Sequence, residues 1–299
     1  MDVQGLVRDF AGTRVLHEVS FAVRPGRMTG FVGANGAGKT TTMRIMMGVL
    51  APTAGAVRWD GSPVTAEQRR SFGYLPEERG LYPKMRVAEQ LRYFARLHGA
   101  DTAKARHRTD VLLERLELGG HSADILETLS LGNQQRVQIA AALIHEPAAL
   151  VLDEPFGGLD PLAVDVMADL LREQIGVGVP VLFSSHQLEL VERLCDDLVI
   201  ISEGRVVVAG SADELRRAES GDAYALHVAD HDDLGWVGAI GGVRVLGVEA
   251  AGEEQIVVFE AERAGAAQDV LREALCRGPV LELRRRTPTL AEIFRETVG

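Results

Sequence analysis

The run from Gly33 to Thr40 has the residue types needed to hold phosphate groups. Its letters, GANGAGKT, fit G-x-x-x-x-G-K-[ST] at every fixed position. Glycines let a backbone curl closely round an anion, so that successive N–H groups point at it. In such a loop the lysine reaches the β- and γ-phosphates, and the hydroxyl after it binds Mg²⁺. We therefore predict a nucleotide site formed by Gly33, Asn35, Gly36, Ala37, Gly38, Lys39, Thr40 and Thr41, with Thr40 also on the metal ion.

Two carboxylates follow a second apolar run. Asp153 and Glu154 come directly after residues 149–152, which are typical of a buried strand. At a strand end beside a phosphate loop, Asp153 would hold Mg²⁺, directly or through water. Glu154 would face the space beyond the γ-phosphate and orient water for in-line attack. Two acids after a strand are a weak signal alone, but together with residues 33–40 they indicate metal-assisted hydrolysis.

Three other side chains have roles that the residues alone leave open. Phe10, with Val15 beside it, either stacks on adenine or is an ordinary apolar anchor of the fold. His186 follows the apolar run 179–184. It either hydrogen-bonds the γ-phosphate or has a structural role.

Ser130 lies just before a helical run that we place at residues 134–145. Its hydroxyl can cap that helix, and the helix N-terminus would then attract an anion. A cap alone would leave Gly132 without an explanation. A nucleotide contact through Ser130 and Gly132 is therefore the alternative to a simple cap.

Composition limits the classes of function. The chain has 299 residues, of which 46% are apolar, and a formal net charge of −11. An acidic chain is not an obvious partner for a nucleic-acid backbone. Its two cysteines, Cys195 and Cys276, cannot form a disulfide framework. The N-terminus lacks signal-peptide features, and no stretch approaches about 18 apolar residues. We therefore expect a cytoplasmic protein without a membrane span.

The catalytic side chains need an α/β framework to position them, and the periodicity of the chain predicts one. Apolar runs that end at the phosphate loop, at Asp153 and before His186 are strands, and helical runs separate them, the first at residues 40–50. Helices at 86–97, 103–116 and 134–145 predict an all-helical insert. Near residues 219–222 the pattern changes to a small α+β tail, with strands at 224–228, 243–248, 255–259 and 280–283 and helices at 266–276 and 290–297.

Taken in order along residues 1 to about 217, these motifs resemble the ATP-binding cassette (ABC) ATPase family. In that family Phe10 matches the adenine-stacking aromatic residue, and Gly33–Thr40 matches Walker A. Leu129–Gln134, LSLGNQ, matches the LSGGQ signature. The remaining matches are Leu150–Glu154 with Walker B, Gly158–Asp160 with the D-loop and His186 with the switch histidine.

The resemblance implies the fold and its domains. It implies a P-loop NTPase cassette at 1–217, with a mixed sheet core, an antiparallel β subdomain and a helical subdomain at about 86–147. A C-terminal accessory α+β domain would occupy 222–299. The stretch Tyr74–Met85 and this tail resemble the bacterial export subfamily of the sodium-efflux and drug-export type.

The sequence departs from the family pattern at two places. Leu131 and Asn133 replace a signature glycine and glutamine, whereas Ser130 and Gly132 are kept. The resemblance implies that the signature, with Gln134, and Asp160 of the D-loop contact ATP held by another chain. Glu77 stands where the Q-loop usually has glutamine. It would still contact the nucleotide and ligate Mg²⁺, but it adds negative charge near the triphosphate.

The resemblance further implies an ATPase subunit that works with a second ABC subunit and an integral-membrane permease. Lys39, Glu154 and His186 would carry catalysis, with ATP and Mg²⁺ bound. Leu81, Tyr82, Pro83 and Met85 would dock on the permease, at the inner face of the membrane. One alternative is an ABC protein acting on ribosomes or nucleic acid, against which the single cassette and acidic charge argue. The other is an ATP-binding regulator with little turnover, which Glu77 and the altered signature keep open.

Overall fold

The protein is described by a computed structural model that covers residues 1–78, 80–219, 222–229, 234–251, 254–286, 289 and 292. It divides into two compact units, one of residues 1–212 and one beginning at Asp213. The division lies at the start of α8 (Ala212–Glu219). The helix expected at 290–297 lies outside the described residues.

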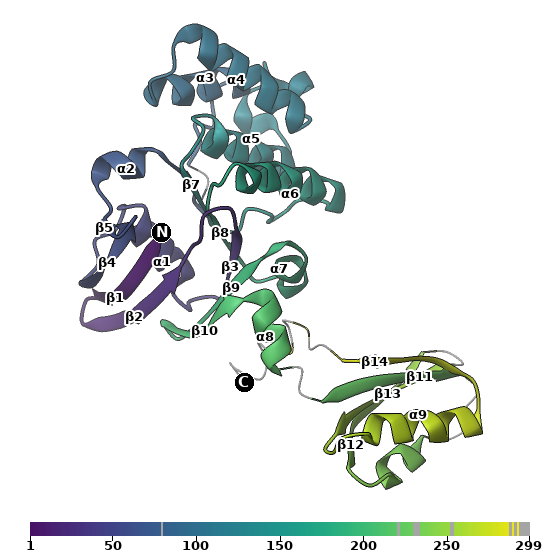
Figure 1. Cartoon of the computed structure of the whole chain (residues 1–299). Coiled ribbons are helices and arrows are strands. Elements are labelled where there is room, and N and C mark those ends of the chain that lie inside the picture. Colours follow the sequence, from purple (N-terminus) through teal and green to yellow (C-terminus); the bar gives the residue numbers. More distant parts are fainter. Residues whose placement is uncertain are drawn as a thin grey trace. The chain divides into compact units, whose positions relative to one another are not determined.

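A six-stranded sheet forms the centre of the first unit, with the order β10-β9-β3-β8-β7-β6. All of these strands except β6 are labelled in Figure 1. Five strands run parallel and β10 is antiparallel to β9. Parallel strands that are buried on both faces appear in the sequence as continuous apolar runs, and β3, β7 and β8 were predicted in this way. Because the strands are parallel, the loops after β3, β6, β7 and β8 leave the same edge. The strands are β3 (Met28–Val32), β6 (Phe72–Leu75), β7 (Ala149–Leu152), β8 (Val181–Ser185), β9 (Asp197–Ser202) and β10 (Arg205–Ser211).

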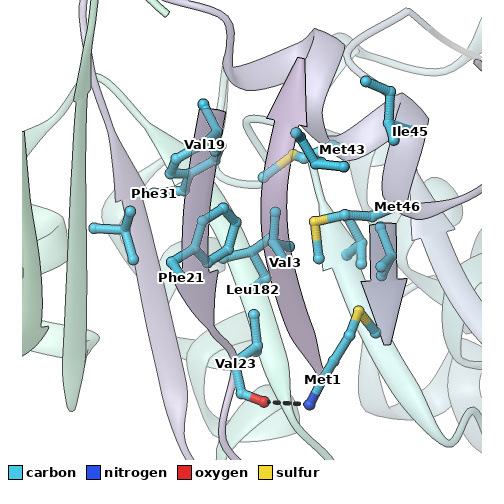
Figure 2. Packing of buried hydrophobic residues seen from close by; sticks show 14 of the residues in the cluster. Met1, Val3, Val19, Phe21, Val23, Phe31, Met43, Ile45, Met46 and Leu182 are labelled. Atoms are coloured by element: carbon cyan, nitrogen blue, oxygen red, sulfur yellow. Dashed lines mark hydrogen bonds between the residues drawn. The ribbon is translucent and has the colours of Figure 1, made fainter. Parts of the chain in front are cut away.

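A second, antiparallel sheet has the order β2-β1-β4-β5. Its strands are β1 (Asp2–Phe10), β2 (Thr13–Ala22), β4 (Ala54–Trp59) and β5 (Ser62–Pro63). Between the sheets lies one apolar core, to which α1 (Lys39–Met46) also contributes (Figure 2). In it the rings of Phe21 and Phe31 lie 5.1 Å apart, centroid to centroid. The amino group of Met1 donates a 2.8 Å hydrogen bond to the carbonyl of Val23 and fixes the start of the chain.

The helical insert is confirmed. Its helices α3 (Val87–Leu97), α4 (Thr102–Arg115) and α5 (Leu131–Leu143) pack on one another (Figure 1). The short 3₁₀ turns η1 (Gly119–His121) and η2 (Leu126–Thr128) connect α4 to α5. After β7 come α6 (Pro161–Gly176) and α7 (Leu188–Leu194), and α2 (Ala66–Arg70) precedes β6.

Two helix boundaries differ from the prediction. The helix after Ser130 begins at Leu131 rather than residue 134, because the Ser130 hydroxyl accepts from the amide of Asn133 and starts the helix at once. The helix after the phosphate loop ends at Met46 rather than residue 50. There Gly48 has a φ of 74° and the amides of the next two residues both bond to the carbonyl of Arg44.

The second unit is an antiparallel sheet of order β12-β13-β11-β14 with a helix against it, which confirms the α+β tail. Leu226 and Phe259 from the sheet pack with Val270 and Ala274 of the helix. The elements are β11 (Ala223–Ala229), η3 (Gly235–Ala239), β12 (Val243–Ala251), β13 (Glu254–Ala261), α9 (Ala266–Arg277) and β14 (Val280–Arg285).

Within the described ranges, no helix is both long and apolar enough to cross a membrane.

Candidate functional site

The phosphate loop links the end of β3 to the start of α1. A Cβ on Gly33 would lie 2.4 Å from the carbonyl oxygen of Ile201, and Gly38 has a φ of 107°, so both positions require glycine. The Nζ of Lys39 donates to the carbonyls of Gly33, at 2.6 Å, and Ala34, at 3.2 Å. With 7% of its surface exposed, this ammonium already lies inside the loop that would hold the phosphates.

Most of the predicted nucleotide residues meet in one cleft of about 520 Å³. Phe10 is 41% exposed there, which leaves its ring accessible to a base, and the guanidinium of Arg8 lies 4.5 Å from the ring centroid. Gly33 and Ala37 of the phosphate loop are buried and do not line the cleft. The lining residues are Phe10, Val15, Asn35, Gly36, Gly38, Lys39, Thr40, Thr41, Glu77, Asp153 and Glu154.

The oxygen atoms in this cleft fit Mg²⁺. Asp153 is 1% exposed, and its Oδ2 atom has no hydrogen-bond partner among the described residues. The Thr40 hydroxyl lies 3.4 Å from Oε2 of Glu77. No three His, Cys, Asp or Glu side chains cluster as a metal site in the described part of the chain. Mg²⁺ is usually held by one or two carboxylates together with water and substrate phosphates, and Asp153 and Glu77 are the carboxylates beside Thr40 in this cleft.

Glu154 and His186 are in contact, as a pair that handles water would require. Oε1 of Glu154 lies 3.0 Å from Nδ1 of His186. Glu154 has a φ of 50°, a left-handed conformation that is uncommon for residues other than glycine. Its amide donates a 2.8 Å hydrogen bond to the hydroxyl of Ser184, which holds this turn in place. The sequence did not single out Ser184.

The signature segment does not line the cleft of its own chain. The start of α5 lies instead beside the D-loop, where a Cβ on Gly132 would be 3.4 Å from the carbonyl oxygen of Gly158. Asp160 caps α6 by accepting from the amide of Ala163 at 2.9 Å. Gln134, predicted to contact a nucleotide, is buried, and its side chain donates to the carbonyl of Leu129 at 2.8 Å. It therefore holds the signature segment together from inside.

A second cavity, of about 300 Å³, lies between β6 and the helical insert. The rings of His98 and His145 stack there with centroids 3.9 Å apart. Burial, together with nearby His98, lowers the pKa of His145 to about 4. This pair could not be recognised from the sequence, because 46 residues lie between His98 and His145. Tyr74 also lines the cavity, and its burial, together with the Asp153 carboxylate, raises the pKa of the phenol.

Comparison with protein families matches the two units separately. The ABC transporter family matches residues 16–157, and the family described as the C-terminal domain of DrrA1-3-like ATP-binding proteins matches residues 210–298. An uncharacterized ABC transporter ATP-binding protein of Bacillus subtilis, YhaQ, is 36% identical over 100% of this chain and 98% of its own length. The daunorubicin resistance ATP-binding protein DrrA3 of Streptomyces coeruleorubidus is 32% identical over 99% of this chain and 95% of its own length. The Nod factor export ATP-binding protein I of Ralstonia nicotianae is 36% identical over 74% of this chain and 70% of its own length.

Two solved structures each match 73% of the chain. The ATP-binding subunit of an ABC transporter superposes with a TM-score of 0.68 at 35% identity, covering 73% of this chain and 92% of the other. The protein cbiO1 from Clostridium perfringens, part of the ABC transporter complex cbiONQ, gives a TM-score of 0.64 at 28% identity, covering 73% and 90%.

Proposed function

The chain belongs to the ABC transporter family of ATP-binding proteins, which are ATPases, and from this premise we propose that it powers an exporter whose membrane permease is a separate chain. The observation that carries the proposal is the cleft in which Lys39, Asp153 and Glu154 meet. A cation for the phosphates, a carboxylate for Mg²⁺ and a base for water are the groups that ATP hydrolysis needs.

The proposed cycle uses two copies of the nucleotide-binding surface. The signature and the D-loop of one chain lie away from its own cleft. We place Ser130, Gly132 and Asp160 against ATP bound in the cleft of a second ABC subunit, identical or related. Mg²⁺ would be held by Thr40, Asp153 and Glu77, and would neutralise charge on the β- and γ-phosphates. Glu154, with His186 against it, would orient the attacking water.

Coupling to a permease is supported by the segment between β6 and α3. Glu77 lines the nucleotide cleft, whereas its neighbours Pro76, Gly80 and Leu81 line the apolar cavity beneath the helical insert. Tyr82 follows, half exposed, and its ring lies 6.0 Å from those of Tyr93 and Phe94. A permease segment seated on this apolar surface would sense movement of Glu77 when ATP binds. The chain would then work at the inner face of the cell membrane.

Export rather than import is proposed because of the relatives. The second unit matches the C-terminal domain of DrrA-like proteins, and relatives are named for daunorubicin resistance and Nod factor export. The regulator alternative is favoured by one contact, that of the Glu77 carboxylate with the Thr40 hydroxyl, which adds negative charge where the phosphates would bind. Measured turnover separates the two.

The test is a capture of the tagged full chain from detergent-solubilised membranes with MgATP. The Glu154→Gln variant should bind ATP, lose turnover by about a hundredfold or more and hold a dimer, because water is no longer oriented. It should also retain a multi-span membrane protein. The matched control is Lys39→Ala, which should lose nucleotide-dependent capture altogether.

Normal turnover in Lys39→Ala would refute the phosphate-loop assignment. Recovery of ribosomes or nucleic acid without a membrane protein would favour the non-transport alternative. Tight ATP binding by the wild-type chain with no turnover, with or without the permease, would favour the regulator.

A further inference from the structure

Ser184 lies where the register of the sheet brings it level with the metal-binding carboxylate. In the parallel pair of β7 and β8, Leu152 is the partner of Phe183, so that the next residues along each strand are Asp153 and Ser184. Both are inside the protein, with 1% and 0% of their surfaces exposed. A hydroxyl at this position is therefore dry, and its hydrogen bonds must be made within the protein.

The Ser184 hydroxyl makes two hydrogen bonds, one to each of the adjacent catalytic positions. It donates to Oδ1 of Asp153 at 2.6 Å and accepts from the amide of Glu154 at 2.8 Å. A serine hydroxyl has a single proton, which is thereby committed to the carboxylate. The neighbouring Ser185 has a different task, because its hydroxyl accepts from the amide of Gln187 beyond His186.

These two bonds fix features that hydrolysis depends on. Because Oδ1 of Asp153 is occupied by Ser184, the unpartnered Oδ2 is the oxygen left for Mg²⁺ or its water. Because the Glu154 amide is anchored, the residue can keep its left-handed φ of 50° and hold its carboxylate against His186. Strain of this kind persists only where surrounding contacts enforce it.

We propose that Ser184 is a positioning residue for ATP hydrolysis, which sets the free oxygen of Asp153 and the backbone of Glu154 at the same time. This inference rests on the proposed function, because it assigns Ser184 a role in that reaction. Ser184 does not line the nucleotide cleft, so its effect would pass through Asp153 and Glu154.

The test compares two variants of equal shape, Ser184→Thr and Ser184→Val. Both add the same volume to a buried strand, so that any overpacking cancels and only the hydroxyl differs. Ser184→Ala removes the hydroxyl without adding volume, in case the larger pair does not fold. Thr29→Val is the control, because Thr29 is fully buried on β3 and its hydroxyl has no hydrogen-bond partner among the described residues.

Two measurements are needed, and the first requires neither nucleotide nor metal. Amide hydrogen exchange in the free protein should be about tenfold or more faster at Glu154 in Ser184→Val than in Ser184→Thr, because the acceptor has gone. In steady-state assays with saturating Mg²⁺, kcat of Ser184→Val should be about tenfold or more below that of Ser184→Thr, with KM for ATP changed much less. Thr29→Val should match the wild type in both measurements.

Equal kcat and equal Glu154 exchange in the Thr and Val variants would overturn the proposal. So would a loss of thermal stability in Ser184→Val with kcat unchanged, since that indicates a purely structural hydroxyl. If the wild-type chain shows no turnover, the proposed function fails instead, while the exchange comparison still decides whether Ser184 anchors Glu154.

Discussion

At the scale of single residues, contacts within the chain hold the charged groups of the nucleotide site in place. The Lys39 ammonium bonds to two carbonyls of its own loop, and Glu154 is held against His186. A site whose charged groups are fixed before binding loses little free energy to reorganisation when charge develops on the phosphates. Phe10 differs, because its exposed ring lies at the rim.

Replacing Phe10 tests whether that ring binds the base. Phe10→Ala should weaken ATP binding about tenfold, because stacking of a base on an aromatic ring contributes about 1–3 kcal/mol. Phe10→Trp keeps an aromatic face and is the matched control. Titration with a fluorescent ATP analogue measures both. Equal affinity in the Ala variant would make Phe10 an ordinary apolar anchor.

At the scale of elements, replacing glycine by alanine should have different effects on thermal stability at two positions. Gly33 follows β3, and Gly132 lies in the first turn of α5. Gly33→Ala should destabilise the chain by several degrees in thermal unfolding, since its Cβ would lie 2.4 Å from a backbone oxygen. Gly132→Ala adds only an ordinary contact at 3.4 Å and stands in the first turn of α5, so stability should be unchanged or slightly raised. Its turnover should nevertheless fall, because a methyl group would separate the signature backbone from the γ-phosphate.

If Gly132→Ala hydrolyses ATP at the wild-type rate, the signature glycine does not approach a phosphate. If Gly33→Ala unfolds at the wild-type temperature, the loop can move away from Ile201 and its geometry is less fixed than the contacts indicate.

The packing of the helical insert on β6 should be pH-dependent through His145. Burial lowers its folded-state pKa from 6.5 to about 4, so the unfolded chain binds this proton first as the pH falls. The resulting stability is present above the unfolded value of 6.5, and it is lost as the pH falls through about 4. His98 and Arg108, both nearby, oppose protonation further. His145→Phe keeps a ring in the cavity without a titrating group.

Urea unfolding at several pH values between about 7.5 and about 4.5 measures this contribution. The wild type should lose about 2 kcal/mol more stability than His145→Phe over that range, after a discount for partial exposure. Parallel losses in the two proteins would assign the acid sensitivity to other groups.

Features encoded in contiguous residues could be predicted from the sequence, whereas features formed by contacts between distant residues could not. Strands β3, β7 and β8 were found because each is a continuous apolar run, and the phosphate loop was found because its motif is contiguous. The helix α2 was missed although Thr65 and Gln68 form a capping box around its first turn. Ser184 and the pair of His98 and His145 could not be found, because sheet register and tertiary packing bring their partners together. The burial of Gln134 was not predicted, because a motif match does not say on which face of α5 a residue lies.

At the scale of the whole molecule, each unit has its own apolar core, so each should fold alone. A fragment ending at Glu219 keeps every residue of the core between the two sheets, and a fragment beginning at Asp213 keeps that of the α+β unit. Each should give a cooperative thermal transition in calorimetry, within about 5 °C of the matching transition in the full chain. A fragment that is unfolded in isolation would show that its core depends on the other unit.

The domain boundary at 217–222 stays a prediction, as does a role of the accessory domain in dimer formation. Comparing the full chain with the fragment ending at Glu219 in the Glu154→Gln background tests that role. If the ATP-dependent dimer forms equally well in the full chain and in the fragment, the accessory domain has no role in dimer formation.

The division between the two units at the start of α8 also bears on how such a chain can evolve. A recombination event within this helix exchanges one whole folded unit for another and leaves both hydrophobic interiors intact. Related genes can therefore keep the first unit and acquire a different C-terminal unit. Sequence differences among such relatives should concentrate after residue 212.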